Sequence, residues 1–137
     1  MKKRLLLLPI ALLLVALVGV PTVSASHVAP ESGLGNPTCD GYKIDPVESG
    51  TYHFGGAWFT IDVYQSANGP EFNWSSNYVV TSLTVKGGPA YNLYIYNPGV
   101  TSDTGLHSPT NYKNPHHYWY GLSHLCFEAS KKDEPKK

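Results

Sequence analysis

Apolar and polar side chains alternate with a period of two along most of the chain after residue 40. Such alternation is typical of β-strands with one buried face, and this region lacks the 3.6-residue apolar spacing of an amphipathic helix. We expect strands at residues 58–64, 79–86, 91–96 and 122–128, with shorter ones at 42–44, 51–54 and 71–74. The pattern predicts an all-β fold, an antiparallel β-sandwich of about seven short strands, with a small barrel as the alternative.

The alternation also assigns side chains to the two faces of each strand. In the first of these strands Phe59 lies opposite Trp58 and Tyr64, which share the more polar face. In the third, Tyr94 and Tyr96 are expected to point away from the core. The residues expected on one common face of the second strand are Val79, Thr81, Leu83 and Val85.

Glycine, proline and asparagine mark the turns between these strands. Residues 67–70 and 87–89 are typical of tight turns, and residues 97–99 are expected to end the tyrosine-rich strand. The longest irregular stretch then runs from Pro98 to Tyr120. Long loops on β scaffolds often carry functional residues, so we expect a site in this stretch.

The N-terminus has the three-part pattern of a secretory signal peptide. A basic start precedes an apolar run of 16 residues, Leu5 to Val20, and small residues then precede an expected cleavage between Ala25 and Ser26. A membrane-spanning helix needs about 20 apolar residues, so an uncleaved anchor fits less well. We predict a secreted, extracellular protein with no membrane anchor after cleavage. The predicted boundaries are a signal peptide at 1–25, a flexible segment at 26–37, the β domain at 38–130 and a charged, disordered tail at 131–137.

Charge and cysteine content narrow the function classes further. Without residues 1–25 the chain has 7 basic and 10 acidic side chains, a net charge of −3, and no concentrated basic face that would bind nucleic acid. Cys39 and Cys126 both lie in the exported part, where an even pair favours a disulfide over free thiols or a metal site. That bond requires the first and last ordered segments to be neighbours, with their Cα atoms within about 7 Å.

An ordered series of short motifs runs through the β domain. Its members are Phe72-Asn73-Trp74-Ser75-Ser76-Asn77, Val85-Lys86-Gly87-Gly88, the pair Tyr94 and Tyr96, Asp103-Thr104-Gly105-Leu106-His107-Ser108-Pro109-Thr110-Asn111, and Ser123-His124-Leu125-Cys126-Phe127. From about Cys39 to Glu128, the chain resembles a family of small secreted or cell-surface bacterial β-domains without an assigned activity. The resemblance implies a disulfide-linked β domain outside a bacterial cell.

The side chains that could carry chemistry form no recognised catalytic or metal-binding pattern. His107, His116, His117 and His124 have none of the spacings of known zinc motifs, although loop residues are free to converge. There is no Gly-x-Ser-x-Gly elbow, and no two carboxylates are placed together for glycosidic cleavage. We predict no enzyme, no metal and no cofactor; a metal-dependent or hydrolytic enzyme using Asp103 and these histidines is an alternative.

The aromatic side chains favour a binding function. Exposed tyrosine and tryptophan rings combine flat apolar faces with polar rims, which suit sugar rings or a protein surface. The expected ligand-contact residues are Trp58, Tyr64, Tyr94, Tyr96, His107, Tyr118, Trp119 and Tyr120. The partner would be a cell-surface glycan or protein, and the sequence predicts no oligomeric state. Two alternatives stay open: the rings pack under the long loop as a second small core, or the protein is a structural cell-surface component that self-associates through a strand edge.

Overall fold

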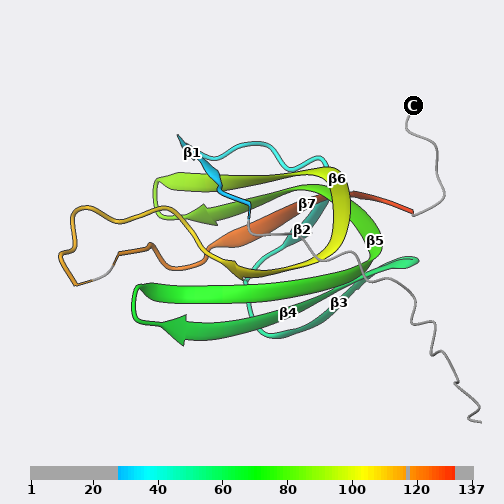
Figure 1. The fold of residues 1–137 in the computed structure, drawn as a ribbon, viewed down its shortest axis with the longest axis horizontal. Helices are drawn as coiled ribbons and strands as arrows, with labels where there is room; N and C mark the ends of the chain where they lie inside the picture. The colour runs from blue at the N-terminus through cyan, green and yellow to red at the C-terminus, as the bar shows by residue number, and fades with distance from the viewer. Residues whose placement is uncertain (1–27, 117, 132–137) are drawn as a thin grey trace, which may run out of the picture.

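The computed structural model describes residues 28–116 and 118–131, which form antiparallel β-strands and no helix (Figure 1). The strands are β1 Glu31–Leu34, β2 Tyr42–Ile44, β3 Gly50–Phe54, β4 Ala57–Ser66, β5 Gly69–Gly87, β6 Ala90–Leu106 and β7 His124–Ser130. The predicted all-β class and the number of strands are confirmed. The predicted signal peptide, its cleavage site between Ala25 and Ser26, and residues 132–137 of the predicted tail lie outside the described residues.

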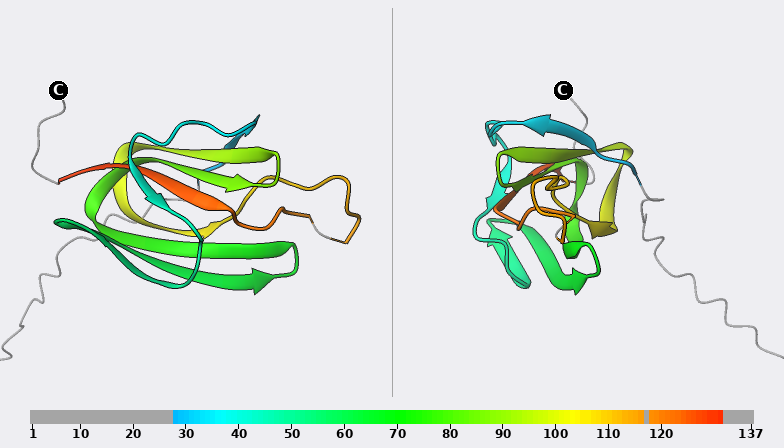
Figure 2. Two further views of the ribbon diagram at one scale, coloured as in Figure 1. Left: turned by 180° about the vertical axis from the view of Figure 1, so that it is seen from behind. Right: turned by 90° about the vertical axis from the view of Figure 1, so that its left-hand side faces the viewer.

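One sheet folds over on itself to make two layers, and the long strands β5 and β6 run through both (Figures 1 and 2). The first part of β5, residues 69–76, pairs with β4, which pairs with β3. The second part, residues 79–86, pairs with β7, which pairs with β2. β6 follows β5 through both layers, and β1 pairs with its first part. Within the described residues the sheet stays open, with β3 and β1 at the ends of its main path, so the two packed layers fit the predicted sandwich better than a closed barrel.

Aromatic rings from both layers meet in the core. Phe127 of β7 packs against Phe59 of β4, with ring centroids 4.5 Å apart, and against Trp74 of β5 at 5.3 Å. The side chains of Phe59 and Phe127 are fully buried, and Trp74 is 3% exposed. Because β7 and β4 belong to different layers, these contacts hold the layers together. Full burial of one such ring is worth about 1.5–3 kcal/mol.

Strands β5 and β6 are longer than the alternation predicts. The two strands expected within residues 71–86 are one strand, and β6 continues through residues 97–99 to its end at Leu106. The prediction that this turn ends the strand and begins the long loop is therefore wrong. At the bend β6 passes close to β5, since a Cβ on Gly99 would lie 2.5 Å from Val79 Cγ1. Glycine allows this close approach, and the backbone pairing resumes beyond it.

An irregularity in the pairing of β5 changes which side chains face the core. The register slips between Val80 and Ser82 against both β6 and β7, and Val80 and Leu83 are both fully buried although they are three residues apart. The prediction that Val79 and Thr81 share a face with Leu83 is therefore wrong. A bulge adds one residue to the strand and inverts the alternation on one side of it.

In β6 the face that carries the tyrosine rings is the buried one. Tyr94 and Tyr96 are 2% and 3% exposed, whereas Ile95 between them is 45% exposed. The Tyr96 hydroxyl donates to Asp103 Oδ2 at 2.7 Å, and Asp103 is itself buried. Burial and then this carboxylate raise the pKa of Tyr96. The prediction that Tyr94 and Tyr96 face a ligand is wrong, because partners inside the fold satisfy hydroxyl groups that the alternation alone would place in solvent.

Strand β1 lies inside the stretch that the sequence predicts to be flexible. Residues 31–34 pair with the first part of β6, so the prediction of a flexible segment over residues 26–37 is wrong for them. Gly33 lies opposite Tyr91, whose ring occupies the space that a Cβ on Gly33 would need. The order of this segment therefore comes from long-range pairing, which its own polar and glycine-containing sequence does not reveal.

The predicted disulfide is confirmed. Cys39 and Cys126 are bonded, with their Cα atoms 5.7 Å apart, and the bond ties the connection between β1 and β2 to strand β7. A disulfide of this kind is consistent with an extracellular location. In the part of the chain that the structure describes, no helix is long and apolar enough to cross a membrane.

Candidate binding groove

The chain leaves β6 at one end of the sandwich and extends beyond the strands before it re-enters the sheet at β7 (Figure 1). Residues 107–123 form this excursion, and the part nearest the sheet is a narrow hairpin. The Asn111 N–H donates to the Tyr118 carbonyl at 2.8 Å, and the Tyr120 N–H donates to the Pro109 carbonyl at 3.0 Å. We call residues 107–123 the loop hairpin. Its cross-strand hydrogen bonds fix the backbone at its base.

The loop hairpin contacts two turns, one from each layer. On one side the Trp119 N–H donates to the Asn68 carbonyl at 3.1 Å, and the Trp119 side chain covers Gly69 in the β4–β5 turn. On the other side the Tyr120 ring lies over Gly88 in the β5–β6 turn, where a Cβ would lie 2.5 Å from Tyr120 Cδ1. Gly88 also has a φ of +55°, which glycine adopts readily. The loop hairpin thus bridges the ends of the two layers.

His107 and Trp119 form a stacked pair at the base of the loop hairpin. Their ring centroids are 3.7 Å apart and their planes differ by 7°. The His107 carbonyl accepts hydrogen bonds from Asn92 Nδ2 at 2.9 Å and from the Tyr94 hydroxyl at 3.1 Å. Burial raises the pKa of Tyr94 to about 12. These contacts anchor the loop, which agrees with the alternative that some of the aromatic residues form a second packed cluster.

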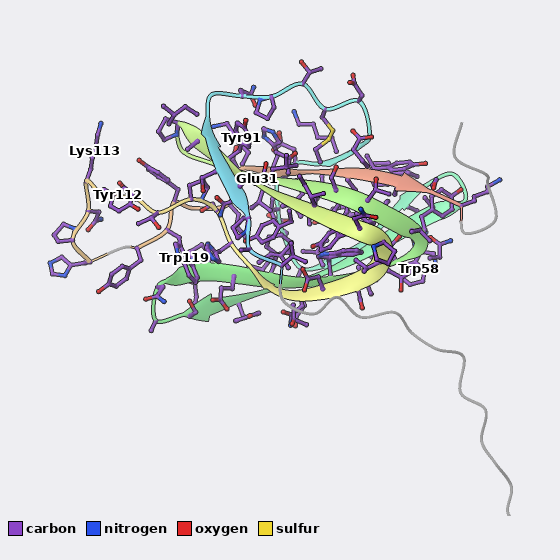
Figure 3. The ribbon with its side chains drawn as sticks, turned by 45° about the horizontal axis from the view of Figure 1, so that its top comes forward. Glu31, Trp58, Tyr91, Tyr112, Lys113 and Trp119 are labelled. Carbon is purple, nitrogen blue, oxygen red and sulfur yellow. A yellow bond between two sulfur atoms is a disulfide. The ribbon has the colours of Figure 1, made fainter. Side chains whose placement is uncertain are left out.

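Beyond this base the loop presents two tyrosine rings to solvent. Tyr112 is 91% exposed and Tyr118 is 56% exposed. Figure 3 shows Tyr112 and Lys113 far out on the loop, with Trp119 closer to the sheet. Exposed aromatic rings on a fixed base are typical of recognition surfaces, because the rings are ready for contact at a low cost in conformational entropy.

A groove of about 290 Å³ lies between the loop hairpin and β1. This volume is at the lower end of the range of roughly 300–1,000 Å³ that is usual for small-ligand sites. Leu34, 84% exposed, is one of its lining residues. The lining comes from three separate parts of the chain: Ser32, Gly33 and Leu34 of β1, Pro89 and Ala90 at the β5–β6 turn, and Pro109, Thr110, Tyr112 and Tyr120 of the loop hairpin.

Two other predicted contact residues lie away from this groove. Trp58 is at the opposite end of the molecule from Trp119 (Figure 3), where its backbone N–H donates to Asn77 Oδ1 at 2.8 Å. Tyr64 is an exposed residue of β4, and its hydroxyl donates to Glu71 Oε2 at 2.7 Å. Partial desolvation and then the hydrogen bond and charge of Glu71 raise the pKa of Tyr64 to about 12. The predicted residues therefore do not form one continuous surface.

Of the nine residues that line the groove, only Tyr120 is among the predicted contact residues, and Tyr112 and Leu34 are the large exposed side chains that the prediction does not include. Tyr112 belongs to the aromatic cluster of the long loop, and that cluster is the signal by which the sequence could have identified it. Leu34 has no comparable signal, because it stands alone among glycine, serine and asparagine in a stretch with no alternation. Only the pairing of β1 with β6 brings Leu34 to the groove.

Metal-ligating side chains are spread over the fold. Among residues 28–116 and 118–131, no group of three His, Cys, Asp or Glu side chains is arranged to hold a metal ion. His107 is stacked on Trp119, and His124 is buried in β7. His117, one of the histidines considered from the sequence, lies outside the described residues.

The burial of His124 predicts a pH dependence of stability. Burial and then the nearby Lys43 lower the pKa of His124 below its ordinary value of 6.5; Lys86 acts in the same direction, and Asp45 opposes them. The unfolded chain therefore takes up a proton at this residue more readily than the folded chain. We expect the stabilising contribution to be complete above about pH 6.5 and to decrease as the pH falls from there toward the folded-state pKa.

Thermal unfolding followed between about pH 7.5 and 5.5 measures this effect. The melting temperature is expected to fall with pH, and the His124→Gln variant is expected to show a smaller slope. His53→Gln is the matched control, because His53 is exposed on β3. An unchanged slope in His124→Gln would contradict the prediction.

Comparison of the chain with protein-family models, with curated proteins and with solved structures finds no match. The resemblance to secreted bacterial β-domains thus stays a prediction from the sequence.

Proposed function

We propose that this protein is a secreted, non-catalytic binding module that recognises a cell-surface glycan or protein through the loop hairpin and the adjoining groove. The observation that carries the proposal is the 91% exposure of Tyr112 on a loop whose base is held by hydrogen bonds and ring packing. Large apolar rings kept in solvent contribute little to folding, whereas their burial by a ligand is favourable.

The anchoring of the loop supports the proposal energetically. A binding loop that must become ordered on contact loses about 0.5–1.5 kcal/mol for each immobilised side chain that has many rotamers. Here the backbone on both sides of the tip is already paired, and Trp119 and Tyr120 fix it to the turns of both layers. A ligand that touches Tyr112 and Tyr118 therefore meets a loop whose base is already ordered, and the remaining cost is the restriction of these exposed side chains.

Two features support the extracellular setting of the proposal. The N-terminal sequence has the layout of an export signal, and the Cys39–Cys126 disulfide is of the kind that persists outside the reducing cytosol. Outside the cell, an exposed recognition loop would meet polysaccharides, surface proteins and their fragments as ligands.

Substitution of Tyr112 tests the proposal. The purified chain is applied to a glycan array and to intact bacterial cells, and retention of the native protein is compared with that of Tyr112→Ala. We expect at least a tenfold loss of affinity, because truncation of a hot-spot residue, a class in which tyrosine is enriched, costs about 2 kcal/mol or more, which corresponds to about 30-fold. The fold should be unaffected, because Tyr112 makes almost no contact that shields it from solvent.

Trp58→Ala is the matched control, because it removes an aromatic ring at the opposite end of the molecule (Figure 3). Its binding is expected to equal that of the native protein once both are shown to be folded by circular dichroism. Native-like binding by Tyr112→Ala, or a loss confined to Trp58→Ala, would refute the proposed site.

A further inference from the structure

We propose that the groove between β1 and the loop hairpin binds a short segment of an uncharged polysaccharide. This inference rests on the proposed function, since it names the ligand class of the same surface. Three properties of the lining carry it: the absence of charge, the kind of polar group that is present, and the fixed position of its aromatic wall.

None of the nine lining residues carries a charge. A phosphate, a carboxylate or an ammonium group that entered the groove would lose solvation without gaining a counter-ion. A neutral ligand has no such penalty. The absence of charge on the lining therefore disfavours acidic glycans, phosphorylated polymers and strongly charged peptides.

The polar side-chain groups among the lining residues are all hydroxyls. They belong to Ser32, Thr110, Tyr112 and Tyr120. A hydroxyl both donates and accepts hydrogen bonds and rotates to suit its partner, and the hydroxyl groups of a sugar have the same two-way character. Ser32 Oγ already donates to Asn92 Oδ1 at 2.6 Å, which leaves its lone pairs to accept from a ligand.

The aromatic wall of the groove is held in place by the fold. The Tyr120 ring packs directly on Gly88, because glycine has no side chain that would hold the ring away from the turn. Pro89 and Pro109, whose backbones are restricted, also line the groove. A fixed aromatic ring beside rigid neighbours suits the apolar C–H face of a sugar, and the same lining supplies hydroxyls for the polar groups of the sugar.

The size of the groove favours a segment of a chain molecule over a globular partner. A volume of about 290 Å³ is small even for a drug-sized ligand. A stable protein–protein contact covers about 800 Å² on each partner, which is far more surface than this lining provides. A polysaccharide fits, because a few of its units occupy the groove while the chain continues into solvent past Leu34 and Tyr112.

Affinity electrophoresis of the full chain tests the inference. Native gels contain one uncharged polysaccharide (dextran, mannan or a soluble β-glucan), one charged polysaccharide (polygalacturonate or chitosan), or none. A proline-rich peptide, the other ligand that a groove of tyrosine and proline suits, is titrated separately. We expect at least one uncharged polysaccharide to retard the protein. The retardation should be the same in about 0.05 and 0.5 M NaCl, because no ion pair is screened.

Thr110→Val provides the sharpest variant, since it removes a lining hydroxyl while keeping the shape and β-branching of the side chain. We expect at least a fivefold loss of affinity for the uncharged polysaccharide, with an unchanged melting temperature. Binding of an apolar or proline-rich peptide would be unchanged or stronger in the same variant. Tyr112→Ala is expected to abolish the retardation.

The outcomes separate this inference from the proposed function. The inference would be overturned if a charged polysaccharide bound most tightly, or if binding weakened with salt. It would also be overturned if the protein preferred the proline-rich peptide. The proposed function would survive these results if Tyr112→Ala removed the binding observed. Failure of every polysaccharide to retard the native protein also overturns the inference, and binding that Tyr112→Ala leaves intact overturns both.

Discussion

Replacement of Phe127 by alanine is expected to lower the free energy of unfolding by about 3–5 kcal/mol. The Phe127 ring is fully buried and contacts Phe59 of the other layer at 4.5 Å and Trp74 at 5.3 Å between centroids. Alanine would remove the ring that joins the two layers, and a folded sheet that is continuous through β5 and β6 has little freedom to close the cavity. The free energy of unfolding of a native domain is about 5–15 kcal/mol in total, so the expected loss is a large share of it.

Urea denaturation monitored by tryptophan fluorescence measures this loss, with Tyr112→Ala as the control. Tyr112 lies in solvent, so its removal should change the free energy of unfolding by no more than about 0.5 kcal/mol. Phe127→Leu should fall between the two variants, because it keeps most of the buried volume. A loss of less than about 1.5 kcal/mol in Phe127→Ala would show that the layers repack without the ring.

Removal of the disulfide is expected to cost about 4–5 kcal/mol. Cys39 and Cys126 are 87 residues apart, so the bond closes nearly the whole domain into one loop and restricts the unfolded chain strongly. In the chain-entropy description the stabilisation grows with the length of the closed loop, and this loop is close to the longest that the domain allows.

The comparison uses the native protein, oxidised and reduced, and the double variant Cys39→Ala/Cys126→Ala. Reduction should lower the urea midpoint of the native protein to about that of the double variant, whose own midpoint should not respond to reductant. Equal midpoints for the oxidised protein and the double variant would refute the prediction. Phe127 neighbours Cys126 in the sequence, so the two effects are measured in separate variants and their sum is not assumed to be additive.

The strands could be predicted from the sequence wherever alternation was undisturbed. In β4 the predicted faces agree with the structure: Phe59 and Ile61 are buried, and Tyr64 is exposed. The strand at residues 42–44 was predicted with its observed bounds. In both strands each side chain points to the same face as the side chain two positions before it, so the sequence pattern alone is sufficient to assign the faces.

The faces of β5 and β6 could not be predicted, because features outside the local pattern decide them. A bulge near Val80 shifts the alternation in β5. In β6, Tyr96 turns inward because its hydroxyl reaches Asp103, seven residues away along a bent strand. A tyrosine side chain is compatible with both solvent and the core. It is buried only where the fold supplies a hydrogen-bond partner for its hydroxyl.

The residues of the candidate groove and loop show the same difference. The aromatic loop could be recognised from composition, and it does contain the two exposed tyrosines. Which of its rings are packed stayed open in the sequence, and the structure shows His107 stacked on Trp119, with Trp119 and Tyr120 against two turns. Leu34 reaches the groove through a strand whose sequence carries no β pattern. These positions depend on contacts between segments that are far apart in the chain.

The sequence by itself determined the all-β class, the existence of most strands and the pairing of the two cysteines. These properties depend on local periodicity and on the number of thiols, which are both visible in one dimension. Only the tertiary structure decided that one folded sheet makes both layers, that two tyrosines are buried, and that β1 and the loop hairpin enclose an uncharged groove. Each of these depends on long-range pairing, because the buried area and the hydrogen-bond partners that fix a side chain's position exist only once distant strands have met.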